Sequence, residues 1–356
     1  MNEIVTSLEQ DAVALMRALI AVPSPSREEH GTADVIEAFL RDHGVPVHRH
    51  GNNVWAFGAR TVPNKPVVLL NSHHDTVRPV ATWTRDSYAA TVEGDRLFGL
   101  GSNDAGGPLV ALIAAFLALH ERTDLPFNLV LAATAEEEIS GSNGIASILP
   151  LLGQVDMAIV GEPTGLRMAT AEKGLLVLDC TAHGISGHAA RSEGDNAILK
   201  ALPDIAWFRD FRFPKVSEQL GPIHMNVTMV QAGTAHNVVP DSCRFTVDVR
   251  CTDAYTLEEV VAIIREQVRC EVVPRSLRLK PSSIAADHPL VQAGQAIGLE
   301  RHGSPTLSDQ ALLPMPSIKL GPGISERSHT ADEFIHLSEV ADGIRCYITL
   351  LEHLRP

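Results

Sequence analysis

The sequence predicts an α/β protein with a mostly parallel sheet flanked by helices, into which a smaller α+β domain is inserted. Two observations predict this class. In the first half of the chain, short apolar stretches alternate with helical patterns, as in parallel βαβ units. Beyond Pro163, longer strand patterns surround two helical stretches, and the earlier pattern resumes at His288. We expect one domain from residues 1–171 and 281–356, interrupted by an inserted domain of residues 172–280.

The elements follow from apolar runs and their periodicity. In the first domain we expect strands at residues 67–70, 128–133, 157–160 and 316–320, and helices at residues 108–120, 145–152 and 338–354. In the inserted domain we expect strands at residues 175–181, 225–230 and 244–250, and helices at residues 196–211 and 257–268. Functional residues in such sheets gather at the carboxyl ends of the strands, so we expect the site residues at these ends.

Charge and composition exclude several classes of partner. The 356 residues include 29 Lys and Arg against 43 Asp and Glu, giving a net charge of −14. A chain this acidic lacks the basic face that nucleic acid or an anionic membrane requires. The first residues lack a signal-peptide pattern, and the apolar run at residues 109–119 is shorter than the ~20 residues of a membrane span. The five cysteines are scattered singly, which is typical of reduced thiols, and we expect a cytoplasmic protein.

The first candidate site residues, His73 and Asp75, follow the apolar strand at residues 67–70. Positions i and i+2 share one face of a strand. An imidazole beside a carboxylate is typical of a histidine that binds a metal ion, because the acid fixes the tautomer of the ring. The alternative interpretation is a surface His–Asp pair.

The next candidates are acidic. Asp104 lies in the glycine-rich loop at residues 99–107, where it would repel phosphate and favour a cation, unless it only caps the following helix. Glu136, Glu137 and Glu138 directly follow the strand at residues 128–133. Three adjacent carboxylates repel one another, and burial raises their pKa values unless a cation is near; a solvated surface run is the alternative.

Two weaker candidates complete the set. Glu162 follows the strand at residues 157–160, and His329 precedes Thr330 and Glu333, whose spacing is that of a capping box. We therefore expect a helix to begin directly after His329. Together the five places supply the imidazole and carboxylate ligands that Zn²⁺ takes where thiolates are not used. One further acid is left to act as a base, as a two-metal hydrolase requires.

In this order, these motifs resemble the di-zinc aminoacylase, carboxypeptidase G and acetylornithine/succinyl-diaminopimelate deacylase family over nearly the whole chain. Within that family, residues 100–106, 159–164 and 304–312 are most similar to the acetylornithine (or succinylornithine) deacetylases of Bacteroides-type bacteria. The resemblance implies a catalytic di-zinc domain and an inserted lid and dimerisation domain, and therefore a homodimer.

The resemblance also implies a ligand set. Asp104 would bridge two Zn²⁺ ions, for which Co²⁺ could substitute. His73 and Glu162 would complete the protein ligands of one ion, and Glu138 and His329 those of the other. The three carboxylates carry −3 against +4 for the two ions, and the remaining charge suits a bridging hydroxide and an anionic substrate.

Further roles follow from the same resemblance. Glu137 would be the general base and Asp75 the partner of His73, with the register of residues 136–138 set by aligning the glycines at 141 and 144. His188 would reach across the dimer to stabilise the oxyanion, and Asn237 and Arg250 would hold the substrate. The chain departs from many members at residues 191–192, where an aromatic residue and then proline are usual.

The implied reaction is removal of the acyl group from an N-acyl amino acid, by attack of a metal-bridging hydroxide with Glu137 as base. The first candidate is N-acetyl-L-ornithine deacetylase of arginine biosynthesis. The alternatives are deacylases of N-succinyl-ornithine or N-acyl-citrulline, a succinyl-diaminopimelate desuccinylase and a dipeptidase. A succinyl group requires a further cation, for which Lys173 and Arg191 are candidates. An inactive binding or scaffold relative is the alternative from outside the enzymes.

Overall fold

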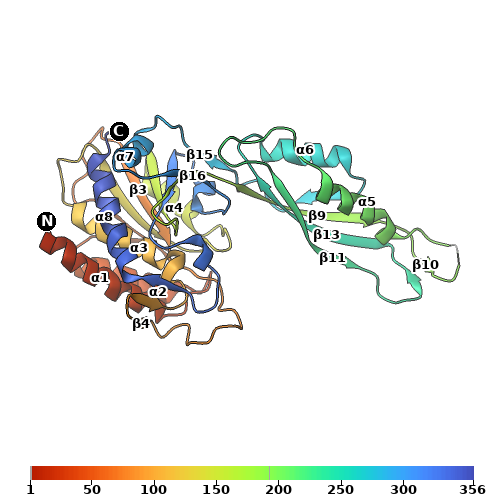
Figure 1. Ribbon diagram of the computed structural model, residues 1–356, viewed down its shortest axis with the longest axis horizontal. Coiled ribbons are helices and arrows are strands. Elements are labelled where there is room, and N and C mark those ends of the chain that lie inside the picture. Colours follow the sequence, from red (N-terminus) through yellow and green to blue (C-terminus); the bar gives the residue numbers. More distant parts are fainter. Residues whose placement is uncertain (1, 192) are drawn as a thin grey trace. The chain divides into compact units, whose positions relative to one another are not determined.

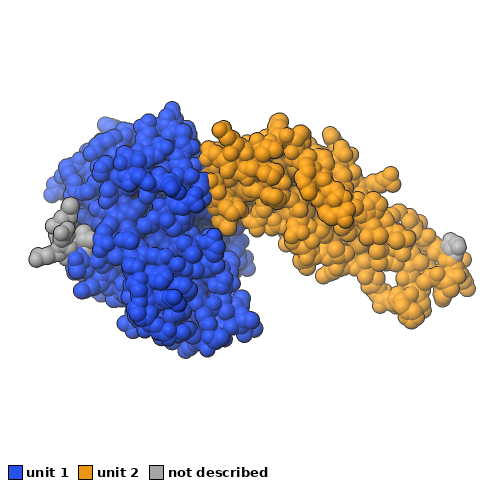
Figure 2. Space-filling model, in the orientation of Figure 1, with its two compact units in different colours: residues 1–170, 284–302, 308–356 blue, residues 171–283, 303–307 orange. Residues whose placement is uncertain are grey.

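The computed structural model describes residues 2–191 and 193–356, with side chains from residue 6 onward, and the chain forms two compact units (Figure 2). The first comprises Met1–Thr170, Ile284–His302 and Ser308–Pro356, and the second comprises Ala171–Ser283 and Gly303–Leu307. The short segment Gly303–Leu307 belongs to the second unit because it packs there: the Lys173 N–H donates to the Ser304 carbonyl oxygen at 3.1 Å. No periodicity in the sequence indicates this return of the chain.

The first unit is built on a mixed sheet (Figure 1). In spatial order the strands of this sheet are β1 (His48–His50), β2 (Asn53–Phe57), β6 (Asn128–Thr134), β3 (Val67–His73), β7 (Met157–Gly161), β17 (Ser317–Leu320), β8 (Met168–Glu172) and β15 (Ser282–Ser283), with β16 (Arg301–Ser304) also paired to β8. Strand β15 and the last two residues of β8, with which it pairs, belong to the second unit. The four central strands, β6, β3, β7 and β17, are parallel, whereas β1, β2, β8 and β15 pair antiparallel. The α/β class is confirmed, and the parallel arrangement is confined to the centre of the sheet.

Helices flank this sheet. They are α1 (Asn2–Ile20), α2 (His30–Asp42), α3 (Gly107–Leu119), α4 (Ile145–Leu152), α7 (Pro289–Ala296) and α8 (Leu337–His353). Helix α3 is apolar on all sides because it packs against α1, α8 and β3 at once. The segment Ser102–Leu119 is long and apolar enough to cross a membrane, but 78% of it is buried inside the protein as this core helix and the turn before it.

The parallel strands explain where the candidate residues lie. Strands β3 and β6 are almost entirely buried, so they read as continuous apolar runs. In register, His73 pairs with Thr134, and Asn71 pairs with Val160. The three strands therefore end at the same edge of the sheet, and the residues that follow them are brought together there.

The second unit has its own core. Its antiparallel sheet has the order β11 (His224–Ala232), β13 (Ser242–Cys251), β9 (Gly174–His183) and β14 (Glu271–Pro274), with helices α5 (Ala197–Asp210) and α6 (Leu257–Gln267). A separate pair joins β10 (Gly187–His188) to β12 (Val238–Val239). Buried and partly exposed positions alternate along β9 and β13, as expected of a sheet with one face on a core. The expected strands and helices of both units are present, with ends shifted by at most three residues.

One expectation is wrong. The chain after His329 forms a loop and then β18 (Phe334–His336), which pairs with β5 (Arg96–Phe98), itself paired with β4 (Thr91–Glu93). Helix α8 begins at Leu337, where His336 and Glu339 form the capping box. Glu333 does not cap a helix, because its buried carboxylate accepts hydrogen bonds from the backbone of the loop that contains Asp104.

Candidate metal centre

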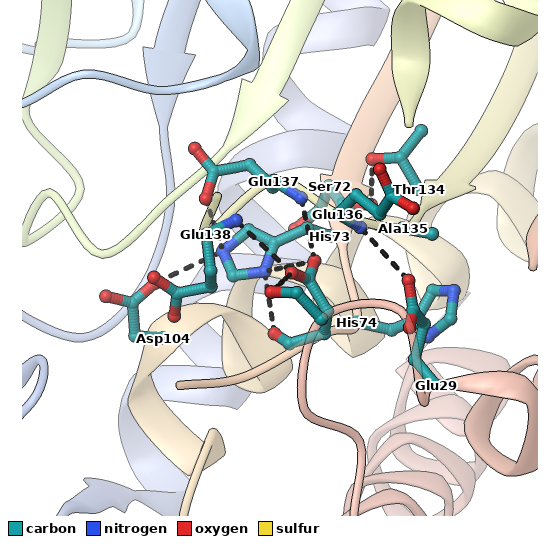
Figure 3. A network of polar contacts seen from close by, with 12 residues as sticks. Glu29, Ser72, His73, His74, Asp104, Thr134, Ala135, Glu136, Glu137 and Glu138 are labelled. Carbon is teal, nitrogen blue, oxygen red and sulfur yellow. Dashed lines mark hydrogen bonds and ion pairs between the residues drawn. The ribbon is translucent and has the colours of Figure 1, made fainter. Parts of the chain in front are cut away.

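The candidate residues at the strand ends meet around His73. His73 is the last residue of β3, Glu137 and Glu138 lie in the loop after β6, and Glu162 follows β7. Asp104 comes from the turn Ser102–Gly106 before α3. Figure 3 shows the carboxylates of Asp104, Glu137 and Glu138 beside the His73 imidazole. Five residues from four separate segments of the chain thus converge on one place.

The distances define a first group of ligands. Nε2 of His73, a residue that is 1% exposed, lies 3.2 Å from Oδ1 of Asp104 and 3.7 Å from Oε1 of Glu162. Oε2 of Glu137 lies 3.8 Å from the same nitrogen. The imidazole therefore faces three carboxylates at once, and the potential ligand atoms of His73, Glu137 and Glu162 lie within 4.8 Å of one another.

A second group lies on the other side of Asp104. Nε2 of His329 is 2.9 Å from Oε2 of Glu138 and 3.7 Å from Oδ2 of Asp104. The two oxygens of Asp104 therefore face different histidines. The ligand atoms of His73, Asp104 and Glu138 also lie within 4.8 Å of one another, so this group and the first one share His73. Asp104 lies between His73 and His329.

The pKa shifts of these residues also indicate a site for cations. Burial and the neighbouring carboxylates of Glu162, Asp309 and Glu138 raise the pKa of Glu137 well above its ordinary value. Burial opposes protonation of His73, yet the surrounding acids raise its pKa well above its ordinary value. Carboxylates crowded and buried in this way are stabilised by bound cations, and histidine with carboxylates is a zinc-type ligand set.

Asp75 holds the acidic loop. Its carboxylate accepts the backbone N–H groups of Glu137 at 3.0 Å and Glu138 at 3.2 Å, and the hydroxyl of Ser26 at 2.6 Å. Nδ1 of His73 lies 3.0 Å from the carbonyl oxygen of Asp75 and 3.6 Å from its carboxylate. The main chain of Asp75 is thus the nearer acceptor for His73, and the side chain fixes the backbone of residues 137 and 138.

Glu136 points away from the other two acids of its run. Its φ is +55°, and its carboxylate accepts hydrogen bonds from the backbone and side chain of Asn143. Its N–H donates to the buried carboxylate of Glu29 (Figure 3). This backbone turn places Glu137 and Glu138, rather than Glu136, on the side of His73.

Two buried acids beside the site were not among the candidates. Asp309, 3% exposed, accepts hydrogen bonds from Asn71 and Thr134, each at 2.8 Å, and its charge contributes to the raised pKa of Glu137. Glu333 holds the Asp104 loop. No sequence motif marks Asp309 as a site residue, because only the folded chain brings it beside Asn71 and Thr134. The sequence around Glu333 resembles a helix cap.

The three candidates from the inserted domain lie in the second unit. His188 in β10 pairs with Val238, and the Ala189 N–H donates to the carbonyl oxygen of Asn237, so the structure brings His188 and Asn237 together. Arg250 lies apart from them in β13, where Asp248 binds its guanidinium at 2.9 and 3.2 Å.

The two candidate cations for a succinyl group differ in environment. Lys173 is 6% exposed, its Nζ donates to the Pro222 carbonyl oxygen at 2.9 Å, and burial together with the charge of Arg250 lowers its pKa. Arg191 is exposed, with its guanidinium 3.9 Å from Glu193. Ser192, the other residue of the unusual pair, lies outside the described residues.

Comparison with known proteins places the chain in a family. The model of peptidase family M20/M25/M40 matches residues 69–353. A succinyl-diaminopimelate desuccinylase of Magnetococcus marinus is 30% identical over 97% of this chain and 99% of the relative. The enzyme of the same name from Corynebacterium glutamicum is 32% identical over 73% of this chain and 72% of the relative.

A solved structure shares the fold. The YXEP protein of Bacillus subtilis, a dinuclear metal binding peptidase from the M20 family, superposes with a TM-score of 0.74 at 16% identity and covers 97% of this chain and 98% of its own. The named relatives are desuccinylases of succinyl-diaminopimelate. They support the family expected from the motifs, but not an assignment to acetylornithine in particular.

Metal binding at His329 should release protons. The hydrogen bond that His329 Nε2–H donates to the Glu138 carboxylate, together with the charges of Glu138 and Asp104, raises the pKa of His329 from 6.5 to about 9. The metal-free protein therefore holds a proton there at pH 7, and a cation must displace it, so apparent affinity should rise as the pH increases toward 9. Calorimetric zinc titrations in buffers of different ionisation enthalpy measure the protons released. His329→Ala should release about one fewer proton per chain; an unchanged count would contradict this assignment.

Proposed function

The chain belongs to the M20/M25/M40 peptidase family, and we propose that it is a dinuclear, zinc-dependent hydrolase that removes the acyl group from an N-acyl amino acid. That it is a hydrolase of amide bonds follows from the family and its desuccinylase relatives. The observation that carries the rest is the position of Asp104, with one carboxylate oxygen near His73 and the other near His329.

We assign His73, Asp104 and Glu162 to one metal ion and Asp104, Glu138 and His329 to the other. The donor set supports this assignment, because imidazole and carboxylate ligands suit Zn²⁺, and Co²⁺ takes similar ligands. The dinuclear character of a structural neighbour supports it as well. When bound, the two ions lower the pKa of water to about 7 and polarise the acyl carbonyl.

Glu137 is the proposed general base. Its carboxylate lies 3.8 Å from His73 Nε2, beside both groups of ligands, and its backbone N–H is held by Asp75. It would take a proton from the attacking water and pass it to the leaving amine nitrogen. Burial keeps bulk water away from this carboxylate, and the positive charge of bound metal ions favours its ionised, basic form.

The first substrate to test is N-succinyl-diaminopimelate. The names of the relatives support it, and so does a pair of neighbouring cations, Lys173 and Arg250, in the second unit. A substrate with several carboxylates suits two cations, and arginine binds carboxylates in a planar fork. N-acetyl-L-ornithine is the second candidate, because residues 100–106, 159–164 and 304–312 resemble acetylornithine deacetylases.

We also propose a homodimer formed through the second unit. Strand β11 is an edge of its sheet, and Met229 and Val230 on it are 52% and 55% exposed. On α5, Leu199 and Leu202 are 64% and 53% exposed. Unpaired edge strands with exposed apolar groups are stabilised by pairing with another chain. In such a dimer, His188 is proposed to reach the partner's site and stabilise the oxyanion.

The dimer is tested by sedimentation velocity. The protein should sediment as a dimer, and Val230→Lys should produce monomers because the charge would be buried at the pairing edge. Val92→Lys, at an exposed position of the first unit, is the matched control and should remain dimeric. A wild-type monomer at micromolar concentration would contradict the proposal.

The base assignment is tested with Glu137→Gln. This variant should still bind both metal ions and lose about 10²- to 10⁴-fold in kcat, the usual contribution of a general base. Metal content by mass spectrometry and steady-state rates measure the two properties. Glu136→Gln is the control, because that carboxylate binds Asn143 away from the site, and it should keep its rate within a few-fold. Normal turnover in Glu137→Gln would contradict the assignment of Glu137 as the general base.

Substrate class is tested by kcat/KM on N-succinyl-diaminopimelate, N-succinyl-ornithine and N-acetyl-ornithine. We expect the succinyl-diaminopimelate derivative to lead by at least about tenfold, or about 1.4 kcal/mol. Lys173→Met should raise KM for succinyl substrates more than for the acetyl one, whereas the exposed Lys200→Met should change neither. A lead for N-acetyl-ornithine, with equal effects of Lys173→Met on all three, would favour the second candidate.

A further inference from the structure

Two loops that supply ligands to the second metal ion are bonded to each other through Glu333. Glu333 is 2% exposed. Its carboxylate accepts hydrogen bonds from three backbone N–H groups. Oε1 accepts from Asn103 at 2.8 Å and from Asp104 at 2.9 Å, and Oε2 accepts from Gly101 at 3.1 Å. The backbone that presents Asp104 is therefore curled around this one carboxylate.

Asn103 joins the same loops from the other direction. Its Nδ2 donates to the carbonyl oxygen of Ile324 at 3.0 Å and to the hydroxyl of Ser328 at 3.3 Å, and its Oδ1 accepts from the Ile324 N–H at 3.1 Å. The carbonyl oxygen of Glu333 also accepts the Gly99 N–H at 3.0 Å. Residues 99–104 and 324–333 are thus tied on both sides of His329.

A carboxylate is the side chain that this arrangement requires. Three N–H donors converge on its two oxygens, and a carboxyl group offers an acceptor at each oxygen, whereas an amide offers only one acceptor oxygen. The bonds that Glu333 makes are to the backbone beside Asp104, where the position of that proposed ligand is set.

We propose that Glu333 is a positioning residue that fixes Asp104 relative to His329 and so prepares the site of the second metal ion. The inference rests on the proposed dinuclear function and extends it to a residue outside the ligand set. Asp75 has the corresponding position for the backbone of Glu137 and Glu138. The loop that carries Asp104 and the loop that carries Glu138 are then each held by one buried carboxylate.

Loss of the Glu333 hydrogen bonds should affect one of the two proposed metal ions more than the other. His73 and Glu162 are placed by the ends of β3 and β7. His329 instead lies on the loop before β18, four residues before Glu333. Loosening the Glu333 bonds should therefore disturb the pairing of Asp104 with His329 more than its pairing with His73. Groups that orient metal ligands typically contribute about 10- to 100-fold to metal affinity.

The test uses Glu333→Gln in the metal-free full-length chain, titrated with Zn²⁺ by calorimetry and with Co²⁺ by visible absorption. Glutamine has the same size but replaces one acceptor oxygen by an NH₂ group that faces a backbone N–H. We expect the second binding step to weaken by about 10- to 100-fold, the Co²⁺ spectrum of that step to change, and the first step to be much less affected. Excess zinc should restore much of the lost kcat.

Asp332→Asn is the matched control. Asp332 precedes Glu333 and also accepts backbone N–H groups, from Thr84 and Arg85, but these lie on a loop without proposed ligands. The control should bind both ions as the wild type does. If Glu333→Gln fails to fold, Glu333→Asp, which keeps both oxygens on a shorter side chain, should show a smaller loss in the same step.

Two results would overturn the inference. One is wild-type affinity for both ions in Glu333→Gln. The other is equal weakening of both steps together with a lower melting temperature of the metal-free protein, which is the result of a merely structural role. A wild-type chain that binds fewer than two ions would instead contradict the proposed function, so the two failures are distinguishable.

Discussion

Mutual repulsion among buried carboxylates is the constraint on which the rest of this structure depends. Asp104, Glu137, Glu138 and Glu162 lie around one buried imidazole, and burial and mutual repulsion raise the pKa values of Glu137 and Glu138. Such a group is costly to keep inside a protein unless cations balance it. The fold concentrates the charges at the carboxyl edge of its parallel strands, and the proposed metal ions would neutralise them.

The scaffold around these charges is rigid for identifiable reasons. Strands β3 and β6 are buried along nearly their whole length, and α3 is packed on several sides. The ligands on loops lack that support and receive it from buried carboxylates, Asp75 for the loop after β6 and Glu333 for the turn before α3. Preorganised ligands lose less conformational freedom when a metal ion binds, so we expect metal affinity to depend on these two acids as well as on the proposed ligands.

Much of this could be predicted from the sequence, because the informative signals were local. Apolar runs ending in His73, in the Glu136–Glu138 run and in Glu162 identified strands and the groups that follow them. Contacts between residues far apart in the chain leave no local pattern in the sequence. The Thr330–Glu333 spacing predicted a helix cap, yet Glu333 binds a loop more than two hundred residues earlier in the chain. The return of residues 303–307 to the second unit and the place of Asp309 likewise follow only from packing.

The substrate was the least predictable feature. The chemistry of bond cleavage needs residues whose types are visible in the sequence, whereas selectivity depends on distances between cations such as Lys173 and Arg250 and the bound acyl group. Similarity to succinyl-diaminopimelate desuccinylases favours N-succinyl-diaminopimelate over N-acetyl-ornithine as the first substrate to test, and the proposed catalytic residues are the same for both. The same site chemistry can serve both, because each substrate is cleaved at a secondary amide between an acyl group and an amino-acid nitrogen.

The most direct test of the central claim is anomalous diffraction at the zinc absorption edge from crystals of the zinc-loaded protein. The account predicts two peaks per chain, one ligated by His73 and Glu162 and the other by Glu138 and His329, with Asp104 binding both. A single peak, or two peaks that do not share Asp104, would contradict it.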